Sequence, residues 1–190
     1  MIFGNQAQRK EDGSKLAQED FASLSGRTPQ THGEHYKYTG NYYELFQILK
    51  KSVPAYLLEA PKLLKIIIFN YLFSNGDAHF KNFSLIETPM GDFKLSPAYD
   101  LVNSKVHIED KYFALEDGLL PQKLAQGKII SQIKTLSEKA GIRGLIYNDI
   151  INTMFNQSDL VEQLTFSSFL DEKIQRNYFQ VYQTRLKKLK

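Results

Sequence analysis

Residues 71–84 read YLFSNGDAHFKNFS, and this stretch decides how the rest of the 190-residue chain is interpreted. An apolar run from Leu63 to Phe73 leads into it, and the length and flanks of that run favour a helix buried at the centre of the domain. After it, apolar residues at 83–86 and 93–95 flank turn residues at 89–92, which predicts a β-hairpin. The hairpin would bring the following Asp100 back beside the motif.

The polar residues of this region are spaced in a chemically meaningful way. Asn82 lies five positions after Asp77, and a second carboxylate, Asp100, follows 18 residues after Asn82. This is the set of residues that kinase-type phosphoryl transfer uses for proton transfer and metal binding. A loop Asp can orient an attacking hydroxyl and accept its proton, whereas an amide oxygen and a second carboxylate suit the hard ion Mg²⁺. The alternative is an ordinary turn, because Asn-Gly, Asp and Asn are common in turns.

Two segments, 75–84 and 95–100, together resemble the C-terminal lobe of the HipA family, the serine/threonine kinases of toxin–antitoxin modules. Upstream, QEDF at 18–21 and KY at 37–38 resemble the part of the same family that leads into this lobe. The resemblance is strong over about residues 14–105 and weak beyond them, and the combined motif is far more specific than any of its pieces.

A second resemblance concerns the core of the motif alone. Asp77, His79 and Asn82 form an Asp-x-His-x-x-Asn pattern that is similar to the catalytic loop of phosphatidylinositol kinases. A small-molecule or lipid kinase is therefore a further alternative, although the sequence shows no identifiable lipid or sugar pocket.

The HipA resemblance implies a role for each polar residue of the site. Asp77 would be the catalytic base or hydroxyl-orienting residue, and Asn82 and Asp100 would bind Mg²⁺. His79 would act in the catalytic loop by holding its geometry, and Lys81 would neutralise a phosphate as a compact point charge. The alternatives for these last two are a buried structural histidine and an exposed loop lysine. The residues implied to bind ATP and its metal ion are Asp20, Lys81, Asn82 and Asp100, although Asp20 could equally be an ordinary surface charge.

The pattern along the whole chain predicts a mostly α-helical domain with one small β-hairpin, which the resemblance identifies as a protein-kinase-like C-lobe. Residues 28–40 are predicted as a loop and residues 101–117 as irregular, with one short extended piece at 112–115. Ser14 and Asn41 are predicted to cap the first two helices. The predicted helices are 15–25, 42–51, 62–73, 129–140, 145–155, about 159–164 and about 170–189, the last with an apolar stripe of Ile174, Tyr178, Val181, Tyr182 and Leu186.

Composition excludes several classes of protein. Apolar residues make up 42% of the chain, which is typical of a globular domain rather than of a disordered one. The absence of cysteine excludes disulfides and thiolate metal sites and fits a cytoplasmic protein, and no apolar run is long enough to span a membrane. The net charge of +3 is too small to indicate nucleic-acid binding by itself. Terminal basic residues are interpreted as a solvated helix end, with a DNA patch as the alternative: Arg185, Lys187, Lys188 and Lys190.

One part of a kinase is missing from the pattern. The chain contains no Gly-x-Gly-x-x-Gly, and the residues before Ser14 are too few for the five strands of an N-lobe. Residues 1–13 are therefore interpreted as a lead-in with a remnant of the interlobe hinge, and residues 14–190 as the lobe itself. The alternatives left open are a split toxin whose other half is a separate chain, a truncated or mis-started gene product, and an artificially shortened chain.

The sequence therefore predicts the catalytic C-lobe of a HipA-like toxin kinase, which transfers a phosphoryl group from Mg–ATP to a protein hydroxyl. Without a separate N-lobe chain it should be incompetent, so whether the chain alone is an enzyme is left open. The implied partners are a HipB-like helix-turn-helix antitoxin, through which DNA would be contacted only indirectly, and a protein substrate, with no membrane. The alternative is a non-catalytic module that binds an antitoxin or a transcriptional repressor.

Overall fold

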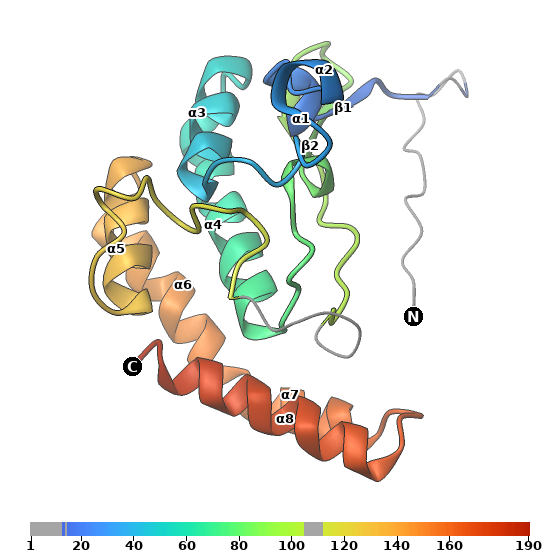
Figure 1. The fold of residues 1–190 in the computed structure, drawn as a ribbon, viewed down its shortest axis with the longest axis vertical. Coiled ribbons are helices and arrows are strands. Elements are labelled where there is room, and N and C mark those ends of the chain that lie inside the picture. Colours follow the sequence, from blue (N-terminus) through green and yellow to red (C-terminus); the bar gives the residue numbers. More distant parts are fainter. Residues whose placement is uncertain (1–12, 14, 105–111) are drawn as a thin grey trace.

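A long apolar helix, α4, organises the fold, and the other elements pack around it (Figure 1). The computed structural model describes residues 13, 15–104 and 112–190. The elements in chain order are β1 (Gln18–Asp20), α1 (Phe21–Leu24), α2 (Pro29–His32), α3 (Tyr42–Ser52), α4 (Tyr56–Leu72), the 3₁₀ turn η1 (Phe80–Asn82), β2 (Ser84–Glu87), β3 (Phe93–Leu95), α5 (Ile129–Lys139), α6 (Gly144–Asn156), α7 (Ser158–Phe166) and α8 (Glu172–Lys187).

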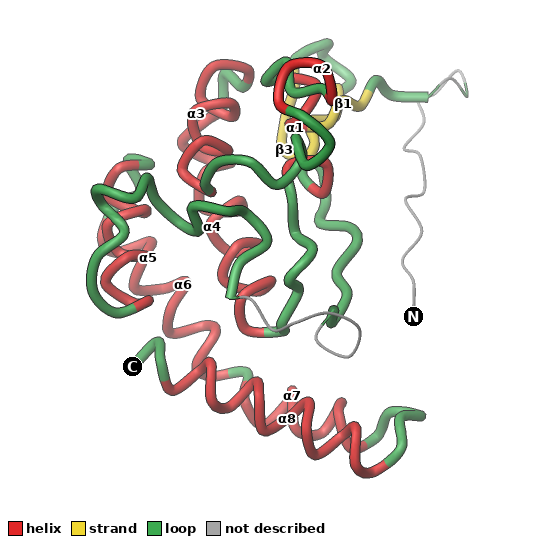
Figure 2. Tube along the Cα trace, in the orientation of Figure 1, coloured by secondary structure: helices red, strands yellow, loops and turns green. Residues whose placement is uncertain are grey.

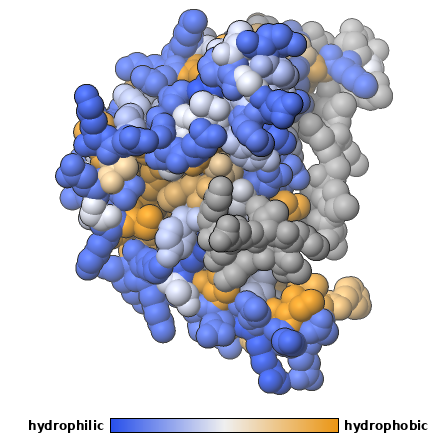
Figure 3. All heavy atoms as spheres, viewed as in Figure 1, coloured by the Kyte–Doolittle hydropathy of each residue, from blue (hydrophilic) through white to orange (hydrophobic). Residues whose placement is uncertain are grey.

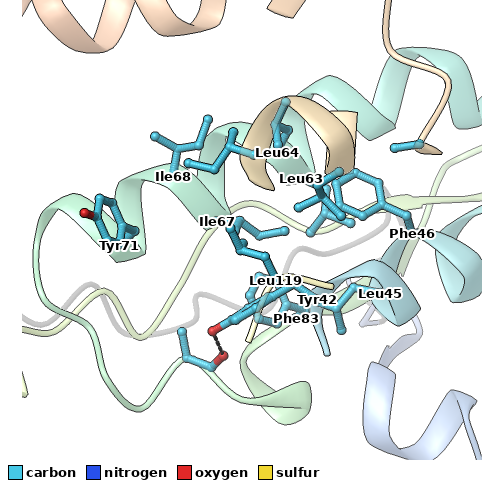
Figure 4. Packing of buried hydrophobic residues seen from close by; sticks show 14 of the residues in the cluster. Tyr42, Leu45, Phe46, Leu63, Leu64, Ile67, Ile68, Tyr71, Phe83 and Leu119 are labelled. Carbon is cyan, nitrogen blue, oxygen red and sulfur yellow. Dashed lines mark hydrogen bonds between the residues drawn. The ribbon is translucent and has the colours of Figure 1, made fainter. Parts of the chain in front are cut away.

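The core lies between α4 and the elements that cover it. Leu63, Leu64, Ile67 and Ile68 of α4 are each at most 1% exposed, which confirms that this helix is buried at the centre of the domain. Figure 4 shows these side chains meeting Tyr42, Leu45 and Phe46 of α3 together with Phe83 and Leu119. Burying large apolar side chains stabilises a fold by about 1.5–3 kcal/mol each, so this cluster anchors the loop that follows α4.

The start of α4 differs from the prediction. The predicted helix begins at Lys62, whereas the helix actually begins at Tyr56 and contains Pro61. Proline removes one helical hydrogen bond, which would join residue 61 to the carbonyl of Leu57. Leu57 is 70% exposed, so this first part of the helix lies at the surface, and only one bond near the helix start is lost.

A three-stranded antiparallel sheet, in the order β1-β2-β3, packs beside α4 (Figure 2). The predicted hairpin is confirmed as β2 and β3, in which Leu85 pairs with Leu95. The helix predicted over 15–25 is wrong for its first half, because Gln18–Asp20 form β1 and pair with β2, with Gln18 opposite Ile86. The predicted cap at Ser14 lies outside the described residues, and the actual N-cap of α1 is Asp20. Glu, Gln and Asp are poor strand formers, so only the distant partner strand makes this segment extended.

Two predicted irregular regions also need correction. Pro29–His32 form a single helical turn, α2, within the predicted loop, and Thr28 and Thr31 make a reciprocal capping box at its start. Residues 112–115 contain bends and form no strand, so the extended piece predicted there is wrong.

Helix α3 is confirmed, with Asn41 as its N-cap and Glu44 completing the capping box.

The helices after residue 128 follow the prediction closely, apart from the face that α8 buries. The half-buried Ile174, Tyr178 and Val181 were predicted for the inner face of α8. The residues that α8 buries are Gln175, Phe179, Tyr182, Arg185 and Leu186.

Arg185 overturns the interpretation of the terminal basic residues as a wholly solvated helix end. Its side chain is 2% exposed, and Nη1 donates a hydrogen bond to the carbonyl of Tyr71 in the last turn of α4. Its guanidinium also lies 5.3 Å from the ring centroid of Tyr71 and 5.5 Å from that of Tyr112. The three lysines, Lys187, Lys188 and Lys190, are exposed as predicted.

One face of the molecule carries apolar surface around α7 and the turn between α7 and α8, seen as orange at the bottom of Figure 3. A groove of about 590 Å³ lies between this region and the end of α4, and Leu101 and Val102 line it next to Asp100.

Among the described residues, no helix is long and apolar enough to cross a membrane.

Candidate functional site

The candidate site begins where α4 ends. The N–H of Asn75 donates to the carbonyl of Asn70 at 2.9 Å and the N–H of Ser74 donates to that of Tyr71 at 3.3 Å, which is the hydrogen-bond pattern of a Schellman cap. Ser74 has φ +59°, a left-handed conformation that glycine usually supplies. The cap turns the chain sharply away from the helix axis and directs the following residues into the site.

Asn75 joins the two carboxylate-bearing segments. Its Nδ2 donates to the carbonyl of Asp100 at 3.0 Å and to Oδ1 of Asn70 at 3.0 Å, and its Oδ1 accepts the N–H of Asp77 at 3.2 Å. Both amide protons and the amide oxygen are therefore used. Because Asn75 is buried, these bonds hold the backbones of Asp77 and Asp100 in a defined relation to each other.

Asp77 lies at the surface of the site, with its side chain 43% exposed. Its Oδ1 accepts a hydrogen bond of 2.6 Å from the hydroxyl of Tyr38 and lies 3.9 Å from Nε2 of His79. Burial and the bond to Asp77 raise the pKa of Tyr38 to about 12, so its phenol remains a proton donor throughout the physiological pH range. A partly exposed carboxylate with one oxygen held in this way is accessible to a substrate hydroxyl.

Asn82 and Asp100 are brought into direct contact. Nδ2 of Asn82 donates to Oδ2 of Asp100, and Oδ1 of Asn82 accepts the N–H of His79 at 3.0 Å. Asp100 has φ +53°, which Asp tolerates better than most residues. The hydroxyl of Tyr99 donates to the carbonyl of Lys81 at 2.8 Å, which fastens the segment ending in Asp100 to the loop.

His79 is a buried member of the loop, only 6% exposed. Burial lowers its pKa and the nearby Lys37 lowers it further, against opposing effects of Asp77 and Asp100. Among the described residues, no hydrogen bond reaches its Nδ1. These surroundings favour the neutral ring and fit a residue that holds the loop's geometry.

The remaining predicted site residues are less closely engaged. The side chain of Lys81 is exposed at the edge of the loop. Asp20 caps α1 by accepting the N–H of Ser23 at 2.9 Å, and its charge acts on Tyr99, but within the described residues it makes no hydrogen bond to Asp77, Asn82 or Asp100. The structure thus brings Asp77, His79, Asn82 and Asp100 together and leaves Asp20 at the periphery.

Two residues of the site received no role from the sequence. Tyr38 belongs to the family resemblance only through the KY pair at 37–38, and its contact with Asp77 spans 39 residues. Ser104 lies in the stretch predicted as irregular and has a structural role here. Its Oγ accepts the N–H of Gly76 at 2.7 Å and donates to the carbonyl of Ser74 at 3.2 Å. No local sequence pattern signals either contact.

The donor set suits a hard cation only in part. Within the described residues there is no group of three or more His, Cys, Asp or Glu side chains close enough to hold a metal ion. Mg²⁺, however, is commonly held by one or two carboxylates together with substrate phosphates and water. The carboxylate of Asp100 meets that lower requirement. Asn82 directs its amide N–H toward Asp100 and its Oδ1 toward the N–H of His79, so its amide would have to turn before its oxygen could share an ion with Asp100.

Comparison with known proteins identifies relatives of this chain. A family model described as "HipA-like C-terminal domain" matches residues 6–161, which is more than half of the chain. Two proteins of Sinorhizobium fredii (strain NBRC 101917 / NGR234), named "Putative kinase Y4mE" and "Putative kinase Y4dM", are each 34% identical, over 94 and 91 residues. These matches cover 47% and 48% of this chain and 21% of each relative.

Two further matches extend over more of the chain. A Haemophilus influenzae (strain ATCC 51907 / DSM 11121 / KW20 / Rd) protein named "Putative kinase" is 24% identical over 162 residues, which are 77% of this chain and 47% of that protein. A chain in the complex of HipA, HipB and operator DNA from Shewanella oneidensis MR-1 superposes with a TM-score of 0.67 at 20% identity, covering 97% of this chain and 46% of that one.

All of these relatives are longer than this chain. The chain spans less than half the length of the relatives it matches. The structural match establishes the fold, which is mostly helical with a small antiparallel sheet. On the extent of the matching family model, the chain belongs to the HipA-like C-terminal domain family.

Proposed function

We propose that this chain is the catalytic lobe of a serine/threonine kinase of the HipA type, which transfers a phosphoryl group from Mg–ATP to a protein hydroxyl. The observation that carries the proposal is the direct contact between Asn82 and Asp100, with Asp77 held beside them through Asn75. Phosphoryl transfer depends mainly on positioning and charge neutralisation, and this arrangement can supply both.

Each residue has a chemical task in this proposal. Asp77 orients the acceptor hydroxyl and takes up its proton as the new phosphate ester bond forms, while the bond from the γ-phosphorus to the bridging oxygen of ATP breaks and ADP leaves. Asn82 and Asp100 would hold Mg²⁺, which neutralises the charge of the ATP phosphates when it is bound. Lys81, exposed at the edge of the loop, can neutralise a further phosphate oxygen, and His79 keeps the loop in shape from its buried position.

The proposed kinase would act together with partner chains. The chain matches less than half of a HipA chain that was solved together with HipB and operator DNA. We therefore include a HipB-like antitoxin, DNA contact only through that antitoxin, a separate N-lobe chain and a cytoplasmic location in the proposal. The N-lobe would supply the glycine-rich loop that covers the phosphates, a motif that these 190 residues lack.

A second candidate function is a non-catalytic module that keeps the fold and binds an antitoxin or repressor. The structural similarity to a chain solved together with HipB and operator DNA supports it. The two functions differ in whether Mg²⁺-dependent ATP binding exists at all.

The test is titration calorimetry of ATP in the presence and absence of Mg²⁺, with the chain alone and with an N-lobe chain added. Asp100→Asn is the informative variant, because Asn also tolerates φ +53° and keeps the shape of the side chain. We expect Asp100→Asn to weaken Mg–ATP binding about tenfold or more, since it removes a charged ligand of the ion.

A matched control is Asp149→Asn, the same change at an exposed position of α6. It should leave the affinity unchanged, and circular dichroism should show both variants folded. Mg²⁺-independent binding, or no binding even with the N-lobe present, would refute the kinase proposal and favour the interaction module.

A further inference from the structure

The hydroxyl of Tyr38 holds one particular oxygen of the candidate catalytic carboxylate. It donates to Oδ1 of Asp77 at 2.6 Å, and Nε2 of His79 lies 3.9 Å from the same oxygen. Within the described part of the chain, no hydrogen bond reaches Oδ2 of Asp77. The two oxygens of one carboxylate therefore have different surroundings.

Tyr38 is itself fixed from several sides. Its N–H donates to the carbonyl of His35 at 2.8 Å, and its own carbonyl accepts the N–H of Glu116 at 3.0 Å. Its ring meets the ring of His79 edge to face, with centroids 5.0 Å apart and planes at 76°. A tyrosine held by backbone and ring contacts gives its hydroxyl a defined position, which an exposed flexible side chain could not do.

The neighbouring backbone ties the same segment to the catalytic loop. The carbonyl of Lys37 accepts the N–H of Phe80 at 3.1 Å, and the carbonyl of Gly40 accepts the N–H of Asp117 at 3.0 Å. Residues 37–40 thus lie between the catalytic loop and the end of the segment that follows Asp100. A shift of either neighbour would be transmitted to Tyr38 and through its hydroxyl to Asp77.

We propose that Tyr38 is a positioning residue for phosphoryl transfer: it anchors Oδ1 of Asp77, so that Oδ2 is the oxygen that faces the acceptor hydroxyl and takes its proton. This inference rests on the proposed function. A hydrogen bond to a carboxylate is stronger than one between neutral groups, so the anchored oxygen is also the weaker proton acceptor of the pair. Orientation of the base within a few tenths of an ångström matters, because small misplacements reduce rates strongly.

The first measurement needs no enzyme activity. The side-chain ¹³Cγ signal of Asp77, assigned by its loss in Asp77→Asn, is followed by NMR in the full chain at pH 7. We expect Tyr38→Phe to shift this signal, because the hydrogen bond to Oδ1 is gone. Tyr36→Phe is the matched control: it makes the same chemical change two residues away, and among the described residues the hydroxyl of Tyr36 makes no hydrogen bond.

The second control separates orientation from stability. Tyr42→Phe also removes a hydrogen bond to the loop, of 2.7 Å, but to the backbone carbonyl of Ala78 rather than to a carboxylate (Figure 4). It should lower stability without moving the Asp77 signal. An unchanged Asp77 signal in Tyr38→Phe, with the fold intact, would overturn the proposal.

The third measurement is γ-phosphoryl transfer from Mg–ATP by the chain together with an N-lobe chain. Tyr38→Phe should lower kcat about tenfold with little change in the KM for ATP, since the nucleotide contacts remain. Equal kcat values for Tyr38→Phe and wild type would refute the positioning role. If no variant, wild type included, transfers phosphate, the proposed function fails, while the NMR shift still decides whether Tyr38 holds Asp77.

Discussion

Two residues with positive φ bracket the candidate site, Ser74 at +59° and Asp100 at +53°. A left-handed conformation costs a non-glycine residue about 1–2 kcal/mol, so each must be held by its surroundings. Ser74 is held by the cap of α4 and by Ser104, whose N–H donates to the Ser74 carbonyl at 3.1 Å. Asp100 is held by Asn75 and Asn82. The strain lies at the two points where the chain enters and leaves the site.

His79 links this site to the pH dependence of stability. Its folded-state pKa is lowered from the ordinary value near 6.5, chiefly by burial, so the unfolded chain binds a proton at this residue more readily than the folded one. Stability from this group is therefore fully present above the unfolded pKa. It is lost as the pH falls through that value toward the lower pKa of the folded state.

We predict that His79→Gln makes stability less sensitive to pH. Urea unfolding at pH 7.5 and at 5.5 should show a smaller loss of free energy in the variant than in wild type, because the buried titrating group is gone. The matched change at an exposed loop position, His35→Gln, should keep the wild-type loss. Equal losses in all three proteins would contradict the assignment.

At the scale of elements, α8 is fastened to the end of α4 by Arg185. The carbonyls in the last turn of a helix lack helical partners and attract cations, and Nη1 of Arg185 meets the carbonyl of Tyr71 there. The planar guanidinium can hydrogen bond and lie over aromatic rings together, which a lysine cannot do equally well. The same turn of α4 leads directly into the site, so α8 supports the loop's origin.

Replacing Arg185 should lower the stability of the fold. We predict that Arg185→Ala lowers the free energy of unfolding by about 3 kcal/mol. The substitution leaves a cavity where the side chain was and removes the charged donor from the buried carbonyl of Tyr71. Lys187→Ala, two residues along on the exposed side of α8, should change stability by no more than about 0.5 kcal/mol. Similar losses in the two variants would show that α8 does not depend on Arg185.

At the scale of the whole molecule, the described residues form one helical body with a small sheet at one end (Figure 1). The candidate site lies where the loop after α4 meets the residues after β3. The proposed kinase needs a second lobe above this site, because ATP phosphates must be covered to exclude water and to hold them in line.

We therefore predict that the 190-residue chain alone hydrolyses ATP no faster than an Asp77→Asn control in a phosphate-release assay. Addition of an N-lobe chain should raise turnover in wild type but not in the control. Robust ATP turnover by the purified chain alone would contradict the requirement for a second lobe.

Much of the fold follows from local pattern. The apolar run of α4 and the turn residues between β2 and β3 each indicate an element within a few neighbouring residues. The capping box at Asn41 and Glu44 does the same for α3. The spacing of Asp77, Asn82 and Asp100 likewise predicts which polar residues gather: the structure joins Asn82 to Asp100 directly and Asp77 to Asp100 through Asn75.

What the sequence by itself determined is therefore the longer helices from α3 to α8, apart from the start of α4, and the β2–β3 hairpin. Tertiary structure alone decided that 18–20 is a strand, that Tyr38 holds Asp77 and that Arg185 is buried against Tyr71. The last two contacts join residues 39 and 114 positions apart. Local preferences act over a few residues, whereas such contacts exist only after the chain has closed the loops between them, so no local pattern encodes them.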